Sequence, residues 1–238
     1  MSRIVGHVAE LHRFPVKSMA GERLRTAEVD WQGIEGDRQY AFVRSANGTR
    51  FPWLTAREVP AMVLHQARFA EPGAPKRSAV LVETPDGAVL SLHDPLLRAH
   101  LETASGEPAH LIQVARGIYD AMPISIQTTG GHANVEAAHG CSIDPRRFRA
   151  NVVIESDLGV EDWQGLRLAF GGEEDGAVVH CADPIPRCIL VTIDPDTGSK
   201  EPKILRTVAQ AFGNAYGVYA APARPGLIRL GDVVQVVG

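Results

Sequence analysis

The chain has 238 residues, of which 45% are hydrophobic and 22% are charged, and its formal net charge is −4. This composition is that of an ordinary folded protein and excludes a disordered chain, and the length suffices for one large domain or two small ones. The net acidity argues against nucleic acid or an anionic membrane as a partner reached through bulk electrostatics. Any basic binding site must therefore be local.

Short strands are predicted along most of the chain. Alternation of apolar and polar residues, or short apolar runs between glycine- and proline-containing turns, indicates each strand. The predicted strands are residues 4–11, 24–29, 40–44, 78–83, 88–92, 152–154, 166–170, 178–181, 189–193, 217–221 and 227–237. We expect the last of these segments to close the chain as a hairpin.

Helices are predicted at three places. Asp94 and Pro95 provide a cap and a first-turn proline for a helix over residues 96–103. A weaker signal covers residues 131–138, and Pro202 opens a helix over residues 203–212. The order of these elements predicts an α+β fold that is predominantly β and built around a β-barrel.

The clearest change in composition along the chain comes near residues 105–108, at a Ser-Gly-Glu-Pro sequence. It predicts two units, residues 1–105 and residues 106–238. An alternating strand pattern begins at residue 4 where a signal peptide would be apolar, and no apolar run reaches the ~20 residues of a membrane span. We expect a cytoplasmic protein without a membrane span.

Three cysteines are present, Cys141, Cys181 and Cys188, and neither their odd number nor their spacing indicates a disulfide framework. Cys188 follows Arg187, whose guanidinium favours the thiolate, the form that attacks electrophiles and binds soft metals. The alternative is a buried cysteine that acts as a small hydrophobic residue. A zinc site from His180, Cys181 and Cys188 is chemically possible, but the spacing of the two cysteines matches no usual zinc motif.

Cations and hydroxyl groups occur in four segments far apart in the chain. These are Lys17 and Ser18, then Asp37 and Arg38, then Arg146, Arg147 and Arg149 before Asn151, and finally Arg187 beside Cys188. Such donors, together with backbone N–H groups in glycine-rich turns, are what an anionic ligand bearing phosphate requires. The alternative is that each cation is a separate surface charge.

Together these segments resemble the MOSC family, which is named for the C-terminal domain of molybdenum cofactor sulfurases, and within it the amidoxime-reducing components. The N-terminal runs LHRFPVKS (11–18), GIEGDR (33–38) and LTARE (54–58) are similar to the family's N-terminal β-barrel region. The runs DAMPIS (120–125), RFRANVVI (147–154), RC (187–188), DPDTG (194–198) and PGLIRLGD (225–232) are similar to the MOSC domain. The resemblance implies a β-barrel MOSC domain combined with an N-terminal MOSC-type β-barrel sub-domain.

The resemblance also implies a cofactor, the molybdenum cofactor (Mo-molybdopterin), and no requirement for pyridoxal phosphate. By motif position Cys188 would be the catalytic residue and the protein's sulfur ligand to molybdenum, and a soft thiolate suits a metal already bound by sulfur. The implied cofactor contacts are Lys17, Ser18, Arg38, Thr128, Thr129, Arg149, Asn151, Arg187 and Cys188 itself.

The activity implied by the resemblance is reduction of N-hydroxylated small molecules, such as amidoximes and hydroxylamines, by a molybdenum-dependent oxidoreductase. The sequence ends soon after its last predicted strand, so we expect no iron–sulfur domain in the chain. Electrons would then come from a separate donor protein, a ferredoxin, a flavodoxin or a cytochrome b5-type system with its reductase. Two alternatives remain open: sulfur transfer through a persulfide on Cys188, and a non-catalytic carrier of the molybdenum cofactor.

Overall fold

A computed structural model describes residues 3–45, 47–159, 163–172 and 174–238. The helices in these ranges are α1 (Pro95–Ser105), α2 (Thr129–His139) and α3 (Pro202–Ala211), with 3-10 turns at η1 (Pro60–Leu64), η2 (Pro75–Arg77), η3 (Pro145–Phe148) and η5 (Ile189–Thr192). The strands of the first half are β1 (Arg3–Arg13), β2 (Glu22–Arg23), β3 (Thr26–Asp30), β4 (Gly33–Ile34), β5 (Tyr40–Arg44), β6 (Gln66–Phe69), β7 (Val80–Glu83), β8 (Val89–Ser91) and β9 (Ala109–Gln113). Those of the second half are β10 (Ile124–Thr128), β11 (Val152–Glu155), β12 (Arg167–Phe170), β13 (Val178–Pro186), β14 (Ala215–Arg224), β15 (Gly226–Arg229) and β16 (Val233–Val237).

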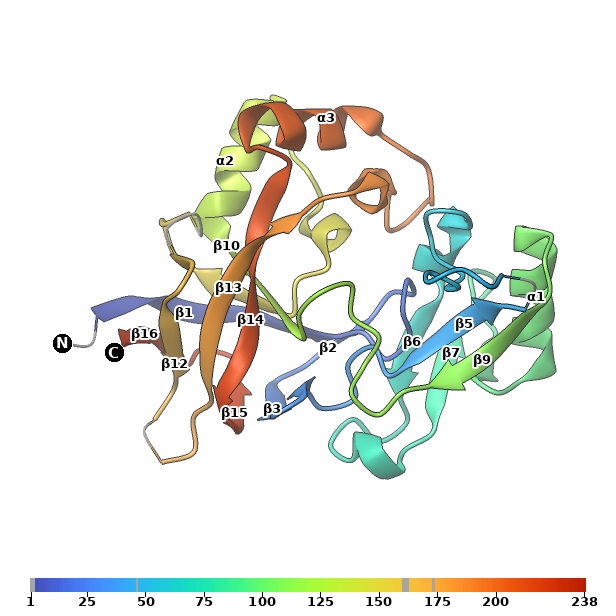
Figure 1. Cartoon of the computed structure of the whole chain (residues 1–238), viewed down its shortest axis with the longest axis horizontal. Coiled ribbons are helices and arrows are strands. Elements are labelled where there is room, and N and C mark those ends of the chain that lie inside the picture. Colours follow the sequence, from blue (N-terminus) through green and yellow to red (C-terminus); the bar gives the residue numbers. More distant parts are fainter. Residues whose placement is uncertain (1–2, 46, 160–162, 173) are drawn as a thin grey trace.

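A closed barrel forms the larger half of the molecule. Among the described residues, seven strands follow one another in the order β11, β10, β14, β13, β12, β16 and β1, and β11 pairs again with β1 to close the ring. Closure leaves no unpaired edge in the ring, which is the usual solution for a sheet that would otherwise expose one. In Figure 1 the first strand, β1, and the last, β16, lie side by side near the two termini.

The barrel strands bury their inward-facing side chains in one apolar core. Val8 and Leu11 of β1, Leu168 of β12 and Val234 of β16 all point into one apolar cluster. In β10 all five residues are buried, because helix α2 covers the strand on one side and the barrel core lies on the other. Burial of this apolar area is the main force that holds the half together.

The smaller half contains two sheets, β5 with β9 and β6 with β7 and β8, and helix α1. It has its own apolar core, to which Phe42, Phe69 and Leu97 contribute. Helix α1 begins as predicted, since the Asp94 carboxylate accepts a hydrogen bond from the backbone N–H of Leu96 at 2.9 Å. This half lies to the right of the barrel in Figure 1.

Helices α2 and α3 form a layer over the barrel and over the turn η5, at the top of Figure 1. A third apolar cluster fills this layer, with Val135, Phe148 and Val208 among its members. None of the helices in the described ranges has the length and apolar character needed to cross a membrane.

The predicted fold class, an α+β fold that is predominantly β and contains a barrel, is confirmed, and all three predicted helices are present. Strands β2, β4, β6, β9 and β10 were not predicted, and β10 is buried throughout although its sequence, Ile-Ser-Ile-Gln-Thr, contains three polar residues. The hairpin predicted over residues 227–237 is wrong, because β15 pairs with β3 whereas β16 pairs with β1 and β12.

The strand predicted over residues 189–193 is also wrong, and this correction concerns the segment that follows Cys188. Residues 189–192 form the 3-10 turn η5, in which the carbonyl of Cys188 accepts a hydrogen bond from the N–H of Val191 at 3.2 Å. The hydroxyl of Thr192 donates to the carbonyl of Ile189 at 2.7 Å and so satisfies a turn carbonyl. Local bonds of this kind compete with strand pairing, which β-branched residues otherwise favour.

The first thirty residues contribute to both halves of the chain. Strand β1 is part of the barrel, whereas Val16 and Met19, which follow it, lie in the apolar core of the smaller half. The boundary between residues 105 and 106 stays a prediction; it falls at the end of helix α1, where Gly106 takes a left-handed conformation with φ 73°.

Candidate functional site

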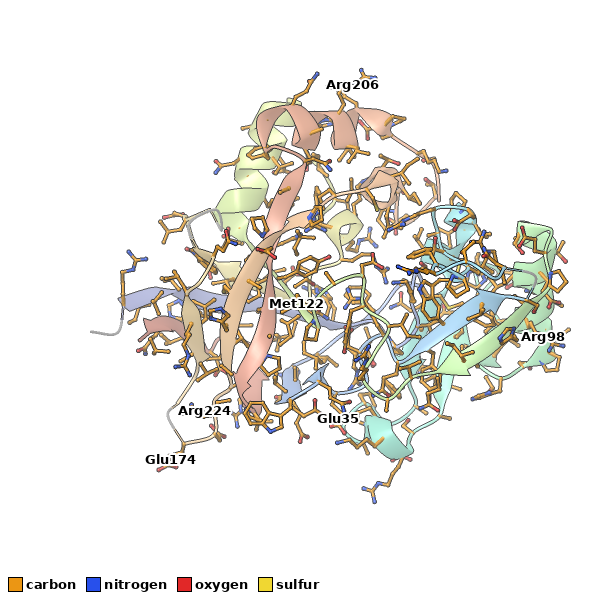
Figure 2. All side chains as sticks on the ribbon, in the orientation of Figure 1. Glu35, Arg98, Met122, Glu174, Arg206 and Arg224 are labelled. Atoms are coloured by element: carbon orange, nitrogen blue, oxygen red, sulfur yellow. The ribbon has the colours of Figure 1, made fainter. Side chains whose placement is uncertain are left out.

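A pocket lies where segments of the smaller half meet the barrel and the turn η5. The predicted site residues that line it are Lys17, Ser18, Arg38, Arg149, Asn151, Arg187 and Cys188. Met122 lines the same pocket, and Figure 2 shows it at the centre of the molecule, between the crossing strands of the barrel and the smaller half. Four segments that are far apart in the sequence therefore converge on one cavity.

The lining of this pocket is strongly positive, although the whole chain is acidic. Its cations are Lys17, Arg38, Arg57, Arg147, Arg149 and Arg187, and within the described residues its one carboxylate is Asp120. An excess of positive charge inside a concave, partly desolvated wall attracts anions more strongly than the same charges spread over a surface. The charge of the pocket therefore favours an anionic ligand.

Arg38 is held by partners from three segments. Its Nη1 atom forms an ion pair with the fully buried carboxylate of Asp37 and donates to Asn151 Oδ1 at 3.1 Å. Its Nη2 atom donates to the carbonyl of Arg149 at 3.2 Å. The second oxygen of Asp37 accepts from the backbone N–H of Phe14 at 2.7 Å, which ties the end of β1 to the arginine.

Asn151 is fully buried, and its side chain is occupied by protein partners. Besides Arg38, its Oδ1 atom accepts from the N–H of Ser125 at 3.2 Å and from the hydroxyl of Ser125 at 2.8 Å. Its Nδ2 atom donates to the carbonyl of His12 at 3.2 Å. Asn151 thus lines the pocket chiefly as a residue that positions Arg38, and a direct cofactor contact by its carboxamide stays a prediction.

Arg149 differs from the other cations because its guanidinium has no carboxylate partner and no hydrogen-bond acceptor among the described residues. Its Cζ atom lies 4.3 Å from the centre of the Phe14 ring, and Arg38 Cζ lies 4.8 Å from the same centre. Burial, and next the charge of Arg38, lower the pKa of Arg149 to about 9. A desolvated arginine without a carboxylate partner indicates an anion-binding site.

Arg187 is fixed by backbone carbonyls instead of carboxylates. Its Nε atom donates to the carbonyl of Tyr216 at 2.8 Å, and its Nη1 atom donates to that of Phe148 at 2.9 Å. The Cζ atom of Arg187 also lies 5.4 Å from the centre of the Phe148 ring and 5.5 Å from the centre of the Tyr216 ring. Burial lowers the pKa of Arg187 to about 10. Gly217, with φ 82°, makes this packing possible, since a Cβ atom there would lie 3.1 Å from Arg187 Nη2.

Lys17 is buried, and its ammonium is already paired. It donates to Asp120 Oδ1 at 2.6 Å and to the carbonyl of Ile118 at 3.2 Å. The neighbouring Ser18 lines the pocket, and its hydroxyl has no protein partner among the described residues. Ser18 is therefore free to bind a ligand, whereas Lys17 would have to share its ammonium with Asp120.

Backbone strain is concentrated at the pocket. Outside glycine, the residues with positive φ in the described ranges are Ser18 at 70°, Arg38 at 50°, Arg149 at 54° and Asn214 at 64°. Three of these four line the pocket. Left-handed conformations are unfavourable for such residues and are found where the surrounding structure or a function requires them.

Cys188 is half-buried, and it stands between strand β13 and the turn η5. Its place in the lining of the pocket contradicts the alternative of an inert cysteine sealed in the core. That description fits Cys181 instead, which is fully buried in the barrel. Burial raises the pKa of the Cys181 thiol to about 12.

The zinc alternative finds no support in the structure. His180 and Cys181 are neighbours on β13, where successive side chains point to opposite faces, and accordingly the first is exposed and the second is buried. Within the described residues, no group of three or more His, Cys, Asp or Glu side chains is placed to hold a metal ion.

Thr128 and Thr129 are not among the residues that line the pocket. The hydroxyl of Thr128 caps helix α2 by accepting from the N–H of Gly131 at 3.0 Å, and it donates to the carbonyl of Leu158 at 2.7 Å. The hydroxyl of Thr129 donates to the carbonyl of Ser156 at 3.2 Å. Both side chains are used to fix the start of α2, and a cofactor contact from either stays a prediction.

The structure gives site roles to three residues that the sequence analysis named only as parts of motifs. Asp37 neutralises Arg38, Asp120 pairs with Lys17, and Ser125 completes the bonding of Asn151. Asp37 was marked by its position directly before Arg38. Asp120 and Ser125 lie in a run that resembles the MOSC domain, but their pairing could not be predicted, because their partners lie 103 and 26 positions away.

The fold and site define a class of protein: a closed β-barrel with a second β-rich half, and between them a cation-rich pocket that contains one accessible thiol. The MOSC N-terminal beta barrel domain matches residues 5–111, and the MOSC domain matches residues 114–235. The chain belongs to the MOSC family.

Relatives with curated names are similar to this chain over only part of its length. The mitochondrial amidoxime-reducing component 1 of Homo sapiens is 32% identical over 134 residues, which cover 50% of this chain and 38% of the relative. The molybdenum cofactor sulfurase of Bombyx mori is 35% identical over 75 residues, which cover 31% of this chain and 9% of the relative. The match thus spans well under two thirds of each relative.

Among solved structures, the YuaD protein from Bacillus subtilis is similar over 99% of this chain and 98% of its own, with a TM-score of 0.55 and 17% sequence identity. At this identity the likeness concerns the fold alone.

Proposed function

We propose that this protein binds the molybdenum cofactor in the pocket and reduces N-hydroxylated small molecules such as amidoximes and hydroxylamines. The observation that carries the proposal is the convergence of Cys188, Arg149 and Arg38 on one cation-rich cavity. Membership of the MOSC family and the similarity to an amidoxime-reducing component support the same reading.

The residues present fit this cofactor. The thiolate of Cys188 is a soft ligand suited to molybdenum bound by dithiolene sulfur. The unpaired guanidinium of Arg149 and the free hydroxyl of Ser18 suit a phosphate, and Arg38 and Arg187 add positive charge nearby. When bound, the cofactor would supply the two-electron redox chemistry, while the chain holds and orients it.

Some of the chain's own residues would bind the cofactor, and others would hold those residues in position. Arg149 would bind the phosphate, while Asp37 and Asn151 would hold Arg38 in place through the bonds described above. Arg187, which its carbonyl partners fix beside Cys188, would place positive charge next to the bound anionic cofactor. These assignments do not include Thr128 or Thr129.

Partners and compartment belong to the same proposal. We place the protein in the cytoplasm, where free thiols such as the three present here are usual. Reduction of an N–OH group consumes two electrons, and we assign their supply to a separate electron-donor protein of the ferredoxin, flavodoxin or cytochrome b5 type.

The experiment that tests the proposal is metal and pterin analysis of protein purified from a host that makes the cofactor. Wild-type protein should contain close to one molybdenum per chain, and Cys188→Ala should lose most of it. Cys181→Ala is the matched control, because that thiol is sealed in the barrel core, and it should keep the metal. Wild-type protein without molybdenum, or a Cys188→Ala variant with a full complement, would overturn the proposal.

Sulfur transfer is the second candidate, because one relative is a molybdenum cofactor sulfurase and the Cys188 thiol is accessible. It requires a persulfide on Cys188 in protein that lacks molybdenum, which intact-mass spectrometry detects. A non-catalytic carrier of the cofactor would instead contain molybdenum and reduce no N-hydroxylated compound with any chemical electron donor.

A further inference from the structure

The turn η3 holds the chain on both sides of Cys188. Before Cys188, Arg187 Nη1 donates to the carbonyl of Phe148, the last residue of η3, at 2.9 Å. After Cys188, Arg147 of η3 donates from its Nη1 atom to the carbonyl of Thr192, where η5 ends, at 2.9 Å. The two arginines therefore cross between the same two segments in opposite directions, and Cys188 lies between their contacts.

Arg147 also forms an ion pair with the loop that follows η5. Its Nη2 atom lies 2.7 Å from Asp194 Oδ2, and the arginine side chain is 8% exposed whereas that of the aspartate is 28% exposed. The other oxygen of Asp194 accepts hydrogen bonds from the N–H groups of Asp196 and Thr197, at 3.0 and 2.9 Å. One arginine thus fixes both the end of η5 and the loop behind it.

The turn η5 is too short to hold the thiol in place by itself. It is a single 3-10 turn, and the N–H groups of Val191 and Ile193 form backbone hydrogen bonds of 3.2 and 3.1 Å. Such turns have poorer hydrogen-bond geometry than an α-helix. Cys188 also lies outside the ladder of β13, which ends at Pro186. The position of the thiol therefore depends on contacts from other segments.

Arg147 is a costly means of stabilising this region. Its side chain is almost fully buried, and its Nε atom has no hydrogen-bond partner among the described residues. A buried arginine loses much of its hydration, and apolar residues of similar volume often give equal or greater stability. What an arginine adds is direction, because its planar guanidinium bonds a carbonyl and a carboxylate at the same time.

We propose that Arg147 is a positioning residue, which acts through the backbone of η5 to keep the Cys188 sulfur at its place in the pocket wall. Its consequence for molybdenum rests on the proposed function, whereas its effect on the thiol does not. The N–H of Glu201 also donates to the carbonyl of Thr192, at 2.8 Å. The protein should therefore still fold when Arg147 is replaced, with η5 attached to the start of α3.

Arg146 provides a matched control, because it joins the same two segments from the outside. Its Nη2 atom lies 2.6 Å from Asp196 Oδ2, but the arginine side chain is 53% exposed and that of the aspartate is 67% exposed. Exposed pairs of this kind contribute little to stability. Arg146 is not among the residues that line the pocket, so Arg146→Met should leave the position of Cys188 unchanged.

Hydrogen–deuterium exchange of the cofactor-free protein is the first test. In Arg147→Met the amides of residues 189–193 should exchange about tenfold faster or more, because the turn opens more often. Strands β10 and β14 should change far less, and Arg146→Met should match wild type throughout. Unchanged exchange in the turn, or an equal increase in the turn and in the barrel strands, would overturn the inference.

Alkylation with iodoacetamide is the second test and follows the sulfur itself. In cofactor-free protein with Cys141→Ala, peptide mass spectrometry measures the rates at Cys188 and at the buried Cys181 separately. Arg147→Met should raise the rate at Cys188 and not at Cys181. Removal of a nearby positive charge would by itself slow the reaction, so a faster reaction reports greater exposure of the thiol.

The variant Arg147→Lys keeps the charge, but its single ammonium replaces a guanidinium that bonds two acceptors at once. Its rate at Cys188 should therefore lie between those of wild type and Arg147→Met. A rate at Cys188 that does not rise in Arg147→Met, or that rises equally at Cys181, would overturn the inference.

The third test uses the molybdenum-loaded protein, a model amidoxime and a reduced viologen as electron donor. Arg147→Met should lose about tenfold or more in kcat per molybdenum, and KM should change by less than about twofold, because a displaced metal ligand affects the reaction more than the binding of substrate. Arg147→Lys should recover part of kcat, and Arg146→Met should match wild type.

The possible failures can be told apart. Wild-type protein that binds no molybdenum or reduces no amidoxime would overturn the proposed function, and the exchange and alkylation rates would still decide whether Arg147 positions Cys188. An active wild type whose kcat is unchanged in Arg147→Met would reject the positioning role in the reaction. A loss confined to KM would assign Arg147 to substrate binding and would likewise reject that role.

Discussion

Arg38 and Asn151 are joined by a hydrogen bond of 3.1 Å that spans 113 positions of the sequence. Arg38 comes directly before the smaller half, and Asn151 comes directly before barrel strand β11. The bond therefore makes the cation-rich pocket a joint product of both halves, and each half should be needed to form it.

Asn151→Ala should destabilise the protein and weaken anion binding together. The substitution removes the acceptor of the Ser125 N–H and one of the two acceptors of Arg38 Nη1, which keeps only Asp37. An unsatisfied buried donor costs about 1–3 kcal/mol, and urea unfolding measures this loss. Gln164→Ala is the control, because Gln164 makes an exposed hydrogen bond to Asp183, and it should change stability by no more than about 0.5 kcal/mol. Equal losses in the two variants would contradict the network.

Asp37→Asn should be among the most destabilising single changes in the chain. The carboxylate of Asp37 is fully buried and pairs with Arg38, so its neutralisation leaves an uncompensated charge in the interior. Breaking a buried pair in this way costs about 3–5 kcal/mol, measured by thermal or urea unfolding.

The matched control for that change is Asp175→Asn, on the surface. Asp175 pairs with Arg229, but both side chains are well exposed, at 55% and 37%. Exposed pairs contribute about 0–1 kcal/mol, so this variant should be close to wild type. If it destabilises as much as Asp37→Asn, burial is not what makes the inner pair important.

Arg149→Met should stabilise the cofactor-free protein and abolish its binding of inorganic phosphate. The pKa of Arg149 is lowered to about 9, so the folded state disfavours the charged form at neutral pH. Replacing this partly buried charge, which has no carboxylate partner among the described residues, with an apolar side chain should raise the free energy of unfolding by about 1 kcal/mol. The advantage over wild type should shrink as the pH rises above about 9, where Arg149 loses its charge in the folded state.

Isothermal titration calorimetry with inorganic phosphate measures the predicted loss of anion binding in Arg149→Met. Wild-type protein should bind phosphate less well above about pH 9, and Arg149→Met should bind it poorly at every pH. Arg98→Met, on exposed helix α1, should leave both binding and stability unchanged. A destabilised Arg149→Met variant with intact phosphate binding would show that Arg149 serves structure and not the ligand.

The three cysteines should differ in their reaction with a thiol reagent. Cys141 is exposed and Cys188 half-buried, whereas Cys181 is fully buried with a pKa raised to about 12. Because the thiolate is the reactive form, two thiols should react in the native protein and all three after unfolding. Cys188→Ala should leave one native reactive thiol, and two remaining would contradict the position of Cys188 in the pocket.

Much of the architecture could be predicted from the sequence, because it depends on local patterns. Residues 40–44 are a short, largely apolar run that forms β5, and Asp94 with Pro95 begins α1 where such residues usually begin helices. The cations of the pocket could also be identified, since Arg38, Arg149 and Arg187 lie in motifs shared with the family.

What only the tertiary structure decided is how these groups are paired. Whether a cation is free or neutralised depends on partners a hundred positions away, so the sequence could not separate Lys17, which Asp120 holds, from Arg149, which no described carboxylate holds. The turn after Cys188 could not be predicted either, because its β-branched residues favour a strand. Local hydrogen bonds and the packing of α3 stabilise η5 instead. Secondary-structure propensity depends on neighbouring residues, whereas charge compensation and burial arise only when segments distant in the sequence come into contact.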